Sequence, residues 1–472
     1  MWIAIRLPRL PLEIFLRGSS TPEPFAVEER HCVFACDRKA FARGVRAGMA
    51  VSASLAFAPR LRVVPRDPAA ETEALLGVAG WAAQFTPGVA LEFPDGVLLE
   101  VSGSLKLFGG LEPLLERLRR GLAEMGWSAT LAGAPTPRAA FWLALAGKQK
   151  FIGSMVELEP ALAVSPVEVL RCGDETLEAL EAIGVRTLGE LRALPREGVA
   201  RRFGQELLDE LDRALGRLSD PRNFFVPPAR FRAAIELSAE VTQAEALLFA
   251  ARRLIVQLAG FLAARSGGVQ RFFLRLKHRD RATEVAIGLV APSRDAEHFA
   301  LLLRERLSSL ALAEPVREIT LQADDVVPLP GRNLGLLLEQ GKPAGNWEHL
   351  VERLCARLGT DAVYGLVLRA EHRPERAVSA GEPDSKPLHL DFGERPFWLL
   401  DRPKPLAEVS AVPNHEGPLE LLAGPERIES GWWDDDDVAR DYFVARMQSE
   451  ALVWIYRERR SEGGWYLHGV FA

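Results

Sequence analysis

The residues with the clearest chemical pattern lie between Leu180 and Leu194. An apolar helix end leads into Gly184, and Thr187 stands where the following helix would need an N-cap. This order is typical of a helix–hairpin–helix, whose backbone N–H groups can point at a phosphate. The alternative is an ordinary helical turn, but the length of the pattern favours a DNA-binding motif. The predicted DNA contacts in this motif are Gly184, Arg186, Thr187 and Gly189.

A second group of basic residues follows a predicted strand over 269–278. Side chains alternate between the two faces of a strand, so Arg271, Arg275 and Lys277 are expected on one face. Arg265 lies shortly before this strand. The pattern fits contact with a DNA backbone and a solvated sheet face equally well, and we retain these four residues as candidate DNA contacts.

Two further clusters could suggest a metal ion, but their spacing does not favour one. Cys32 and Cys36 are four residues apart, with no second cysteine pair to complete a zinc site. The four aspartates of 434–437 would alternate between faces if the segment were a strand, and a helix start or a solvated turn explains them better. We therefore predict no metal and no cofactor.

These candidate sites require a mixed framework of helices and strands. The apolar run that begins at Trp2 predicts a buried strand, ended by Pro8 and Pro11 before a helix. Residues 89–101 predict a β-hairpin, with Asp95 in its turn and Gly96 expected at positive φ. Residues 166–217 are almost entirely helical in pattern. Residues 231–323 show the order β-α-β-β-α-β.

The C-terminal part differs in composition from the rest. Three antiparallel strands are predicted over 441–447, 451–457 and 465–470, and 377–387 is predicted to be a flexible linker. Residues 325–345 form a predicted loop that carries several leucines. Apolar side chains in such a loop need a surface to cover them, either on this chain or on a partner.

Composition narrows the class of protein without identifying it. The 472 residues suggest three or more domains, and the net charge of −6 gives no global sign of a nucleic-acid partner. We find no uninterrupted apolar run long enough to span a membrane and no signal-peptide pattern. The four cysteines are scattered, so we expect a cytoplasmic protein without contact to a membrane.

The order of these parts resembles a Y-family, translesion-type DNA polymerase. The resemblance rests on residues 35–49 for the fingers, 93–102 and 134–136 for palm motifs, and the hairpin at 180–194. The tail, 421–469, resembles a polymerase-like branch that serves bacterial DNA-damage mutagenesis. The implied fold is α+β and multidomain: palm (1–24 and 71–165), fingers (25–70), helix–hairpin–helix thumb (166–220), βαββαβ little finger (230–325), a region with a candidate clamp motif, a helix and a linker (326–389), and a C-terminal β-rich, partner-binding extension (390–472).

The same resemblance bears on catalysis. Nucleotidyl transfer uses two Mg²⁺ ions held by carboxylates, which the family takes from an Asp after the first strand and an Asp-Glu pair in the second palm motif. Here Arg6 and Leu7 stand at the first place, and Asp95 is followed by Gly96. The steric-gate aromatic expected near Leu10 is absent as well. We therefore expect a palm that has lost its metals.

The resemblance also implies partners. A non-catalytic relative would bind primer-template DNA, the sliding β-clamp, an error-prone C-family DNA polymerase α subunit and ImuA, a RecA-like protein. The candidate clamp-binding peptide lacks the usual glutamine and phenylalanine and consists of Arg332, Asn333, Leu334, Leu336 and Leu337. Two alternatives stay open: an active translesion polymerase with rearranged carboxylates, and a DNA-binding repair factor without a clamp link.

Overall fold

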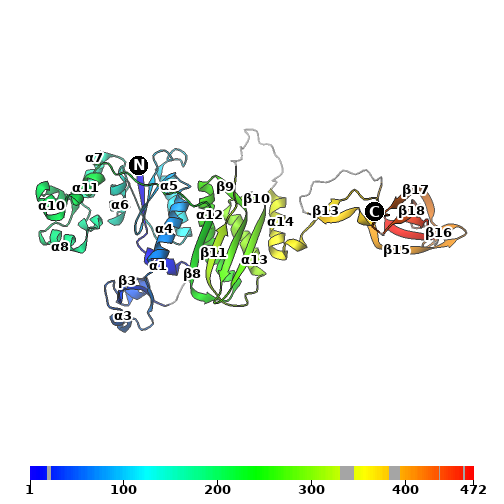
Figure 1. Cartoon of the computed structure of the whole chain (residues 1–472), viewed down its shortest axis with the longest axis horizontal. Helices are drawn as coiled ribbons and strands as arrows, with labels where there is room; N and C mark the ends of the chain where they lie inside the picture. Colours follow the sequence, from blue (N-terminus) through cyan, green and yellow to red (C-terminus); the bar gives the residue numbers. More distant parts are fainter. Residues whose placement is uncertain (19–22, 330–344, 382–393, 435, 461–462, 472) are drawn as a thin grey trace. The chain divides into compact units, whose positions relative to one another are not determined.

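The computed structural model describes the chain except for residues 19–22, 330–344, 382–393, 435, 461–462 and 472. The chain separates into two compact units, Met1–Arg357 and Leu358–Ala472 (Figure 1). The second unit begins before residue 390, where the sequence suggested the C-terminal region. We describe each unit by itself.

A four-stranded sheet lies at the centre of the N-terminal part. Its strands run in the order β5 (Gly88–Glu92), β6 (Gly96–Glu100), β1 (Trp2–Arg6) and β7 (Thr130–Ala134), with β1 antiparallel to both neighbours. Both faces of β1 are covered, which explains its continuous apolar sequence. The predicted first strand and the helix after it, α1 (Leu10–Leu16), are confirmed.

Helices cover this first sheet on both sides. Ile3 and Ile5 belong to the core formed with α4 (Pro68–Ala82) and α5 (Leu111–Glu124), whereas Ala4 belongs to the core of α6 (Pro137–Leu145) on the other face. Residues 105–110 form turns, and helix α5 begins at Leu111.

Both outer strands of the first sheet are partly covered by single residues from elsewhere. Phe224 bridges Ala90 of β5 and stacks on Trp2, with ring centroids 6.4 Å apart. At the opposite edge, Phe151 bridges Gly133 of β7. The Pro-rich segment 219–229 therefore packs on the sheet through Phe224.

A small subdomain follows α1. Its sheet has the order β3 (Cys32–Cys36), β2 (Phe25–Glu29), β4 (Arg62–Pro65), with helices α2 (Arg38–Ala42) and α3 (Val51–Phe57). Asp37 caps α2 by accepting a hydrogen bond from the backbone N–H of Ala40 at 2.7 Å.

A helical region follows the first sheet, as predicted. It consists of α7 (Met155–Ala163), η1 (Val167–Leu170), α8 (Asp174–Ala182), α9 (Leu188–Ala193), α10 (Arg196–Phe203) and α11 (Gln205–Ala214). Its apolar side chains share a core with α6. The hairpin at 180–194 is the junction of α8 and α9.

The second sheet has the predicted β-α-β-β-α-β order. Its elements are β8 (Phe231–Val241), α12 (Leu247–Ala264), β9 (Gly267–Lys277), β10 (Ala282–Ser293), α13 (Ala296–Ser308) and β11 (Val316–Ala323). The strands lie in the order β10-β9-β11-β8, and the short β12 (Val326–Pro328) pairs with β9. Figure 1 shows α12 and α13 along one face of this sheet. Helix α14 (Gly345–Leu358) follows, close to the predicted 346–358.

Helix α12 is long and apolar enough to cross a membrane by length and composition, but this is weak evidence for a span. Ten of its residues, including Leu254 and Leu258, are buried in the protein, and it packs between the second sheet and α4. Its apolar composition is therefore explained by its place in the protein core.

The C-terminal unit is rich in strands. Strands β13 (Gly365–Leu368) and β14 (Val378–Gly381) pair with each other, so the predicted linker at 377–387 is wrong for its first residues. A six-stranded sheet has the order β16 (Val412–Asn414), β15 (Trp398–Val409), β20 (Trp465–Val470), β19 (Leu452–Glu458), β18 (Val438–Arg446), β17 (Glu420–Ser430). Strands β18, β19 and β20 match the prediction, and β15 to β17 were missed.

Candidate functional site

Asp95 forms the centre of a small charged cluster at the end of the first sheet. Arg6 Nε donates to Asp95 Oδ2 at 3.1 Å, and Arg171 Nη2 donates to Asp95 Oδ1 at 2.6 Å. Arg6 also donates from Nη1 to the carbonyl oxygen of Leu145 at 3.1 Å. The Asp95 side chain is only 14% exposed. Both carboxylate oxygens are thus engaged by guanidinium groups.

Gly96 leaves no room for a side chain. It lies in β6 opposite Arg6, and a Cβ atom placed on it would come within 2.4 Å of Phe141 Cε2. Gly96 does not have a positive φ, so the expectation of a left-handed turn residue is wrong. Residue 96 must be glycine because Phe141 approaches its backbone closely. The Arg171 guanidinium lies over the same Phe141 ring, 5.2 Å from its centroid.

Glu13, the carboxylate nearest to β1 in sequence, faces another direction. Its Oε2 accepts a hydrogen bond from the backbone N–H of Ser128 at 2.9 Å. It lies beside Arg17 and Arg253, where burial, with repulsion from Arg253, lowers the pKa of Arg17 to about 9. Glu13 therefore belongs to a buried ionic group at α1 and not to the cluster around Asp95.

The remaining carboxylates on the hairpin strands also have partners. Glu92 Oε1 accepts from Arg138 at 2.9 Å, and its second oxygen accepts from Arg222. Glu100 lies at the other end of β6, 3.3 Å from the N-terminal amine.

Two residues of the charged cluster around Asp95 were singled out from the sequence, namely Arg6 and Asp95 itself. Arg171 was missed, because a contact across 76 residues leaves no local pattern.

The helix–hairpin–helix has the predicted geometry with one unexpected feature. Gly184 has a φ of +83°, which only glycine adopts readily, and Thr187 caps α9. However, the carboxylate of Glu190 accepts hydrogen bonds from the backbone N–H groups of Arg186 and Thr187, at 2.8 and 2.9 Å. These bonds lower the pKa of Glu190. Two donors predicted to face a phosphate are thus held by a side chain of the same motif.

Gly189 has a packing role in this motif. A Cβ atom on it would lie 2.9 Å from the carbonyl oxygen of Ala163 at the end of α7. The structure thus gives a structural reason for each glycine of the hairpin. Their contact with DNA stays a prediction.

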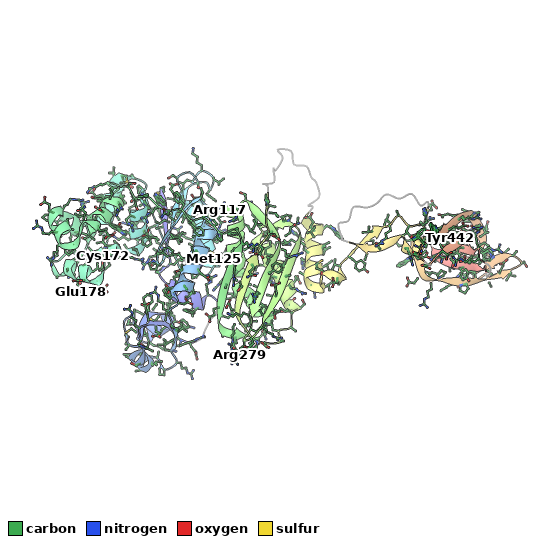
Figure 2. The ribbon with its side chains drawn as sticks, in the orientation of Figure 1. Arg117, Met125, Cys172, Glu178, Arg279 and Tyr442 are labelled. Atoms are coloured by element: carbon green, nitrogen blue, oxygen red, sulfur yellow. The ribbon has the colours of Figure 1, made fainter. Side chains whose placement is uncertain are left out.

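The basic residues of β9 share one face of the second sheet, as predicted. Arg271, Arg275 and Lys277 are exposed, whereas Phe272 and Leu274 point into the core. Acidic residues adjoin them: Arg275 is opposite Glu284 in the register, and Lys277 Nζ donates to Glu318 at 2.8 Å. Figure 2 shows Arg279 at the end of this sheet, just after β9. The face is therefore of mixed charge.

Arg265 does not join this group. It follows the end of α12, and its Nη2 donates to the carbonyl oxygens of Pro227, at 3.0 Å, and Pro228. Its guanidinium holds the Pro-rich segment before β8. The candidate clamp residues Arg332, Asn333, Leu334, Leu336 and Leu337 lie outside the described residues.

In the C-terminal unit, the aspartates near Trp433 are engaged by arginines. Asp434 accepts hydrogen bonds from Arg373, at 2.7 and 2.9 Å, and from Arg376 at 2.6 Å. The bond from Arg373 lowers the pKa of Asp434 to about 2. This turn, which follows β17, is an ion-paired structural junction, and sequence spacing alone did not reveal its arginine partners.

A buried polar group lies in the six-stranded sheet of the same unit, around Tyr442 (Figure 2). The Tyr442 hydroxyl is 2.8 Å from Nδ1 of His468 and accepts a hydrogen bond from Arg440 at 3.2 Å. Burial lowers the pKa of His468 to about 4 and raises that of Tyr442. At neutral pH both groups are uncharged beside the Arg440 cation.

The chain is similar in sequence to known proteins. Residues 18–144 match the model of the impB/mucB/samB family. Protein ImuB of Caulobacter vibrioides (strain NA1000 / CB15N) is 29% identical over 457 residues, which cover 91% of this chain and all of that protein. The similarity includes the C-terminal unit as well as the polymerase-like part.

Further relatives are polymerases. DNA polymerase IV of Shewanella sp. (strain W3-18-1) is 26% identical over 205 residues, 41% of this chain and 56% of that protein. Among solved structures, a Dbh ternary complex aligns at a TM-score of 0.40 and 17% identity, over 69% of this chain and 99% of that one. DinB from Sulfolobus solfataricus aligns at 0.39 and 18%, over 70% and 99%.

Proposed function

We propose that the chain is an ImuB-like relative of the Y-family DNA polymerases and that it acts in DNA-damage-induced translesion synthesis as a scaffold without polymerase activity. In this proposal the first sheet is the palm, β2–β4 belong to the fingers, α8–α11 to the thumb and the second sheet to the little finger. For these domains we keep the boundaries that the sequence predicted.

The cluster of Arg6, Asp95 and Arg171 carries this proposal. Two-metal catalysis needs several carboxylates around two divalent ions. Here two guanidinium groups occupy the one carboxylate, and each would repel a cation about 4 Å away by several kcal/mol at an intermediate dielectric. The neighbouring position, Gly96, is closed to a second carboxylate by Phe141.

Primer extension tests the missing activity directly. We expect no nucleotide incorporation by the purified full chain with Mg²⁺ or Mn²⁺, and none by the double variant Arg6→Asp/Gly96→Glu, because Phe141 and Arg171 still fill the site. DNA polymerase IV assayed in parallel is the positive control. Extension by the wild type that Asp95→Ala abolishes would support the alternative, an active polymerase with rearranged carboxylates.

Binding of primer-template DNA is the second part of the proposal. The hairpin between α8 and α9 and the basic residues of β9 are the surfaces offered for it. Their contacts would be with phosphates, so affinity should fall steeply as salt rises. Fluorescence anisotropy at several salt concentrations measures this, and an affinity independent of salt would contradict it.

The partners proposed for this scaffold are the sliding β-clamp, an error-prone C-family polymerase α subunit and ImuA. The candidate clamp peptide is the segment 332–337, and the C-terminal unit would serve the other two partners in the cytoplasm. A pull-down with purified clamp separates the hypotheses. Binding by wild type that Leu334→Ala/Leu336→Ala/Leu337→Ala loses supports the scaffold, and no binding by wild type supports a repair factor without a clamp link.

A further inference from the structure

Three side chains with metal-binding chemistry meet where α14 packs against the βαββαβ domain. His298 is in the first turn of α13, and His349 and Glu352 are on α14. Residues three apart on a helix project from the same face, so His349 and Glu352 present their side chains together. Residues from two separate helices thus converge on one point.

The donor atoms of these side chains are close enough for one ion. One donor atom from each residue lies within 4.8 Å of the others, and His298 Nε2 is 2.5 Å from Glu352 Oε2. The imidazole rings of His298 and His349 stack with centroids 4.0 Å apart. A tetrahedral zinc ion about 2.1 Å from each donor would hold the donors about 3.4 Å apart. The exposed His349 ring would have to turn out of its stacked arrangement, so that the nitrogen lone pairs of both imidazoles point at the ion.

The surroundings of the cluster have two features of a metal site, namely burial of two ligands and a hydrogen bond that orients one of them. His298 and Glu352 are 5% and 4% exposed. The second carboxylate oxygen of Glu352, Oε1, accepts a hydrogen bond from the backbone N–H of Val290 at 2.7 Å, which orients the carboxylate. His349 is exposed and leaves a path from solvent.

We propose that His298, His349 and Glu352 form a binding site for a divalent transition-metal ion, with zinc the best match. Two imidazoles and one carboxylate are donors suited to zinc, while magnesium and calcium prefer sites built from oxygen alone. Three protein ligands leave a coordination position for water. Because the ligands come from α13 and α14, the ion would join α14 to the domain that contains α13.

Metal titration of the full chain tests the site, with untagged protein freed of metal by a chelator. Zn²⁺ and the spectroscopic probe Co²⁺ are added to wild type and to His349→Gln, an exposed change that should not disturb folding. We expect one high-affinity ion per wild-type chain and at least a tenfold loss of affinity in His349→Gln. The matched control His415→Gln, at a histidine in the C-terminal unit, should bind as wild type.

A structural readout accompanies the titration. Hydrogen exchange in 345–358 should slow when Zn²⁺ is added to wild type and should not change in His349→Gln. The Co²⁺ spectrum should lack thiolate charge-transfer bands, because no cysteine is among the ligands. Such bands would assign the ion to cysteines and overturn the proposal, as would binding that His349→Gln and Glu352→Gln leave intact, or the absence of binding.

Discussion

Basic residues have opposite surroundings in the two large sheets of the N-terminal unit. At the end of the first sheet, Arg6 and Arg171 converge on Asp95, which is largely shielded from water. On the second sheet, Arg271, Arg275 and Lys277 stand on an open face beside scattered acidic groups. The two arginines of the first sheet are held in place by Asp95, whereas the basic side chains of the second sheet can exchange one charged partner for another.

This difference shows why similar residues support different functional conclusions. Asp95 is the shielded member of the cluster, and burying its carboxylate without the two arginines would be costly. Arg6, Arg171 and Asp95 therefore act as one structural unit. An exposed arginine contributes little to stability and can turn toward a phosphate. The first sheet therefore holds its charges in fixed ion pairs, whereas the charges on the second sheet can be offered to a ligand.

Removing Asp95 should give the largest effect. Asp95→Ala removes two charge-assisted hydrogen bonds, one from Arg6 and one from Arg171, and we expect a loss of about 3 kcal/mol in the stability of the N-terminal unit. Glu318→Ala, which removes the partner of the exposed Lys277, should cost under about 0.5 kcal/mol. Thermal melting, with hydrogen exchange in β1 and β6, measures both. Equal losses in the two variants would remove the contrast between the sheets.

His468 in the C-terminal unit is another buried polar residue, and its protonation should affect stability. Its pKa is about 4 in the folded state and near 6.5 when unfolded, so the unfolded chain binds the extra proton first. The contribution of His468 to stability is complete well above pH 6.5 and should fall by about 2.5 kcal/mol as the pH drops from 6.5 to 4. Denaturant unfolding followed by tryptophan fluorescence measures this. His468→Gln should flatten the pH profile, and an unchanged profile would argue against this histidine.

A methyl group at Gly96 tests the packing around the cluster. Gly96→Ala places a Cβ atom against Phe141, and we expect overpacking to cost about 1.5 kcal/mol. Gly103→Ala, where a Cβ atom meets nothing within 4 Å, is the control and should be near neutral. Thermal melting compares them, and Phe141→Leu should recover part of the loss in Gly96→Ala. A stable Gly96→Ala would mean that the site can admit a side chain.

The open sheet face is tested by DNA affinity. Arg271→Ala/Arg275→Ala should weaken primer-template binding about tenfold, near 1.4 kcal/mol, and lower the salt slope by about 2. Lys277→Ala should have less effect, because Glu318 already pairs with Lys277. Fluorescence anisotropy measures the affinities. The control Arg402→Ala/Lys404→Ala removes equal charge from β15, and an equal loss there would indicate a nonspecific charge effect.

The smallest effect is expected at the hairpin between α8 and α9. Glu190→Gln keeps a hydrogen-bond acceptor for the N–H groups of Arg186 and Thr187 but removes the negative charge near a bound phosphate. We expect DNA affinity to rise about twofold at low salt, with little change in stability. Anisotropy titration measures it. A fall in affinity would mean that the Glu190 charge supports the interface.

Local patterns predicted most of the N-terminal unit. The first strand, the hairpin around Asp95 and the βαββαβ order all follow from apolar periodicity and turn residues, and the structure confirms them. Strands β15 and β17 were missed because prolines, such as Pro403, Pro405 and Pro425, interrupt their alternation. The structure accommodates the interruptions with shifts in strand register.

The site was less predictable than the fold. Arg6 and Asp95 could be singled out because their places in the chain matched a known motif. The approach of Arg171 and Phe141, and the capture of the hairpin N–H groups by Glu190, depend on tertiary packing and on side-chain rotamers. A carboxylate three residues after Thr187 does predict a capping box, so that contact had a usable sequence signal.

The residues that pair with the two edge strands of the first sheet should affect the solubility of the protein. An uncovered edge strand offers unpaired N–H and C=O groups to any other chain and favours aggregation. Phe224 at β5 and Phe151 at β7 each occupy part of such an edge. These two covers reduce the length of free edge along which one molecule could add its sheet to that of another.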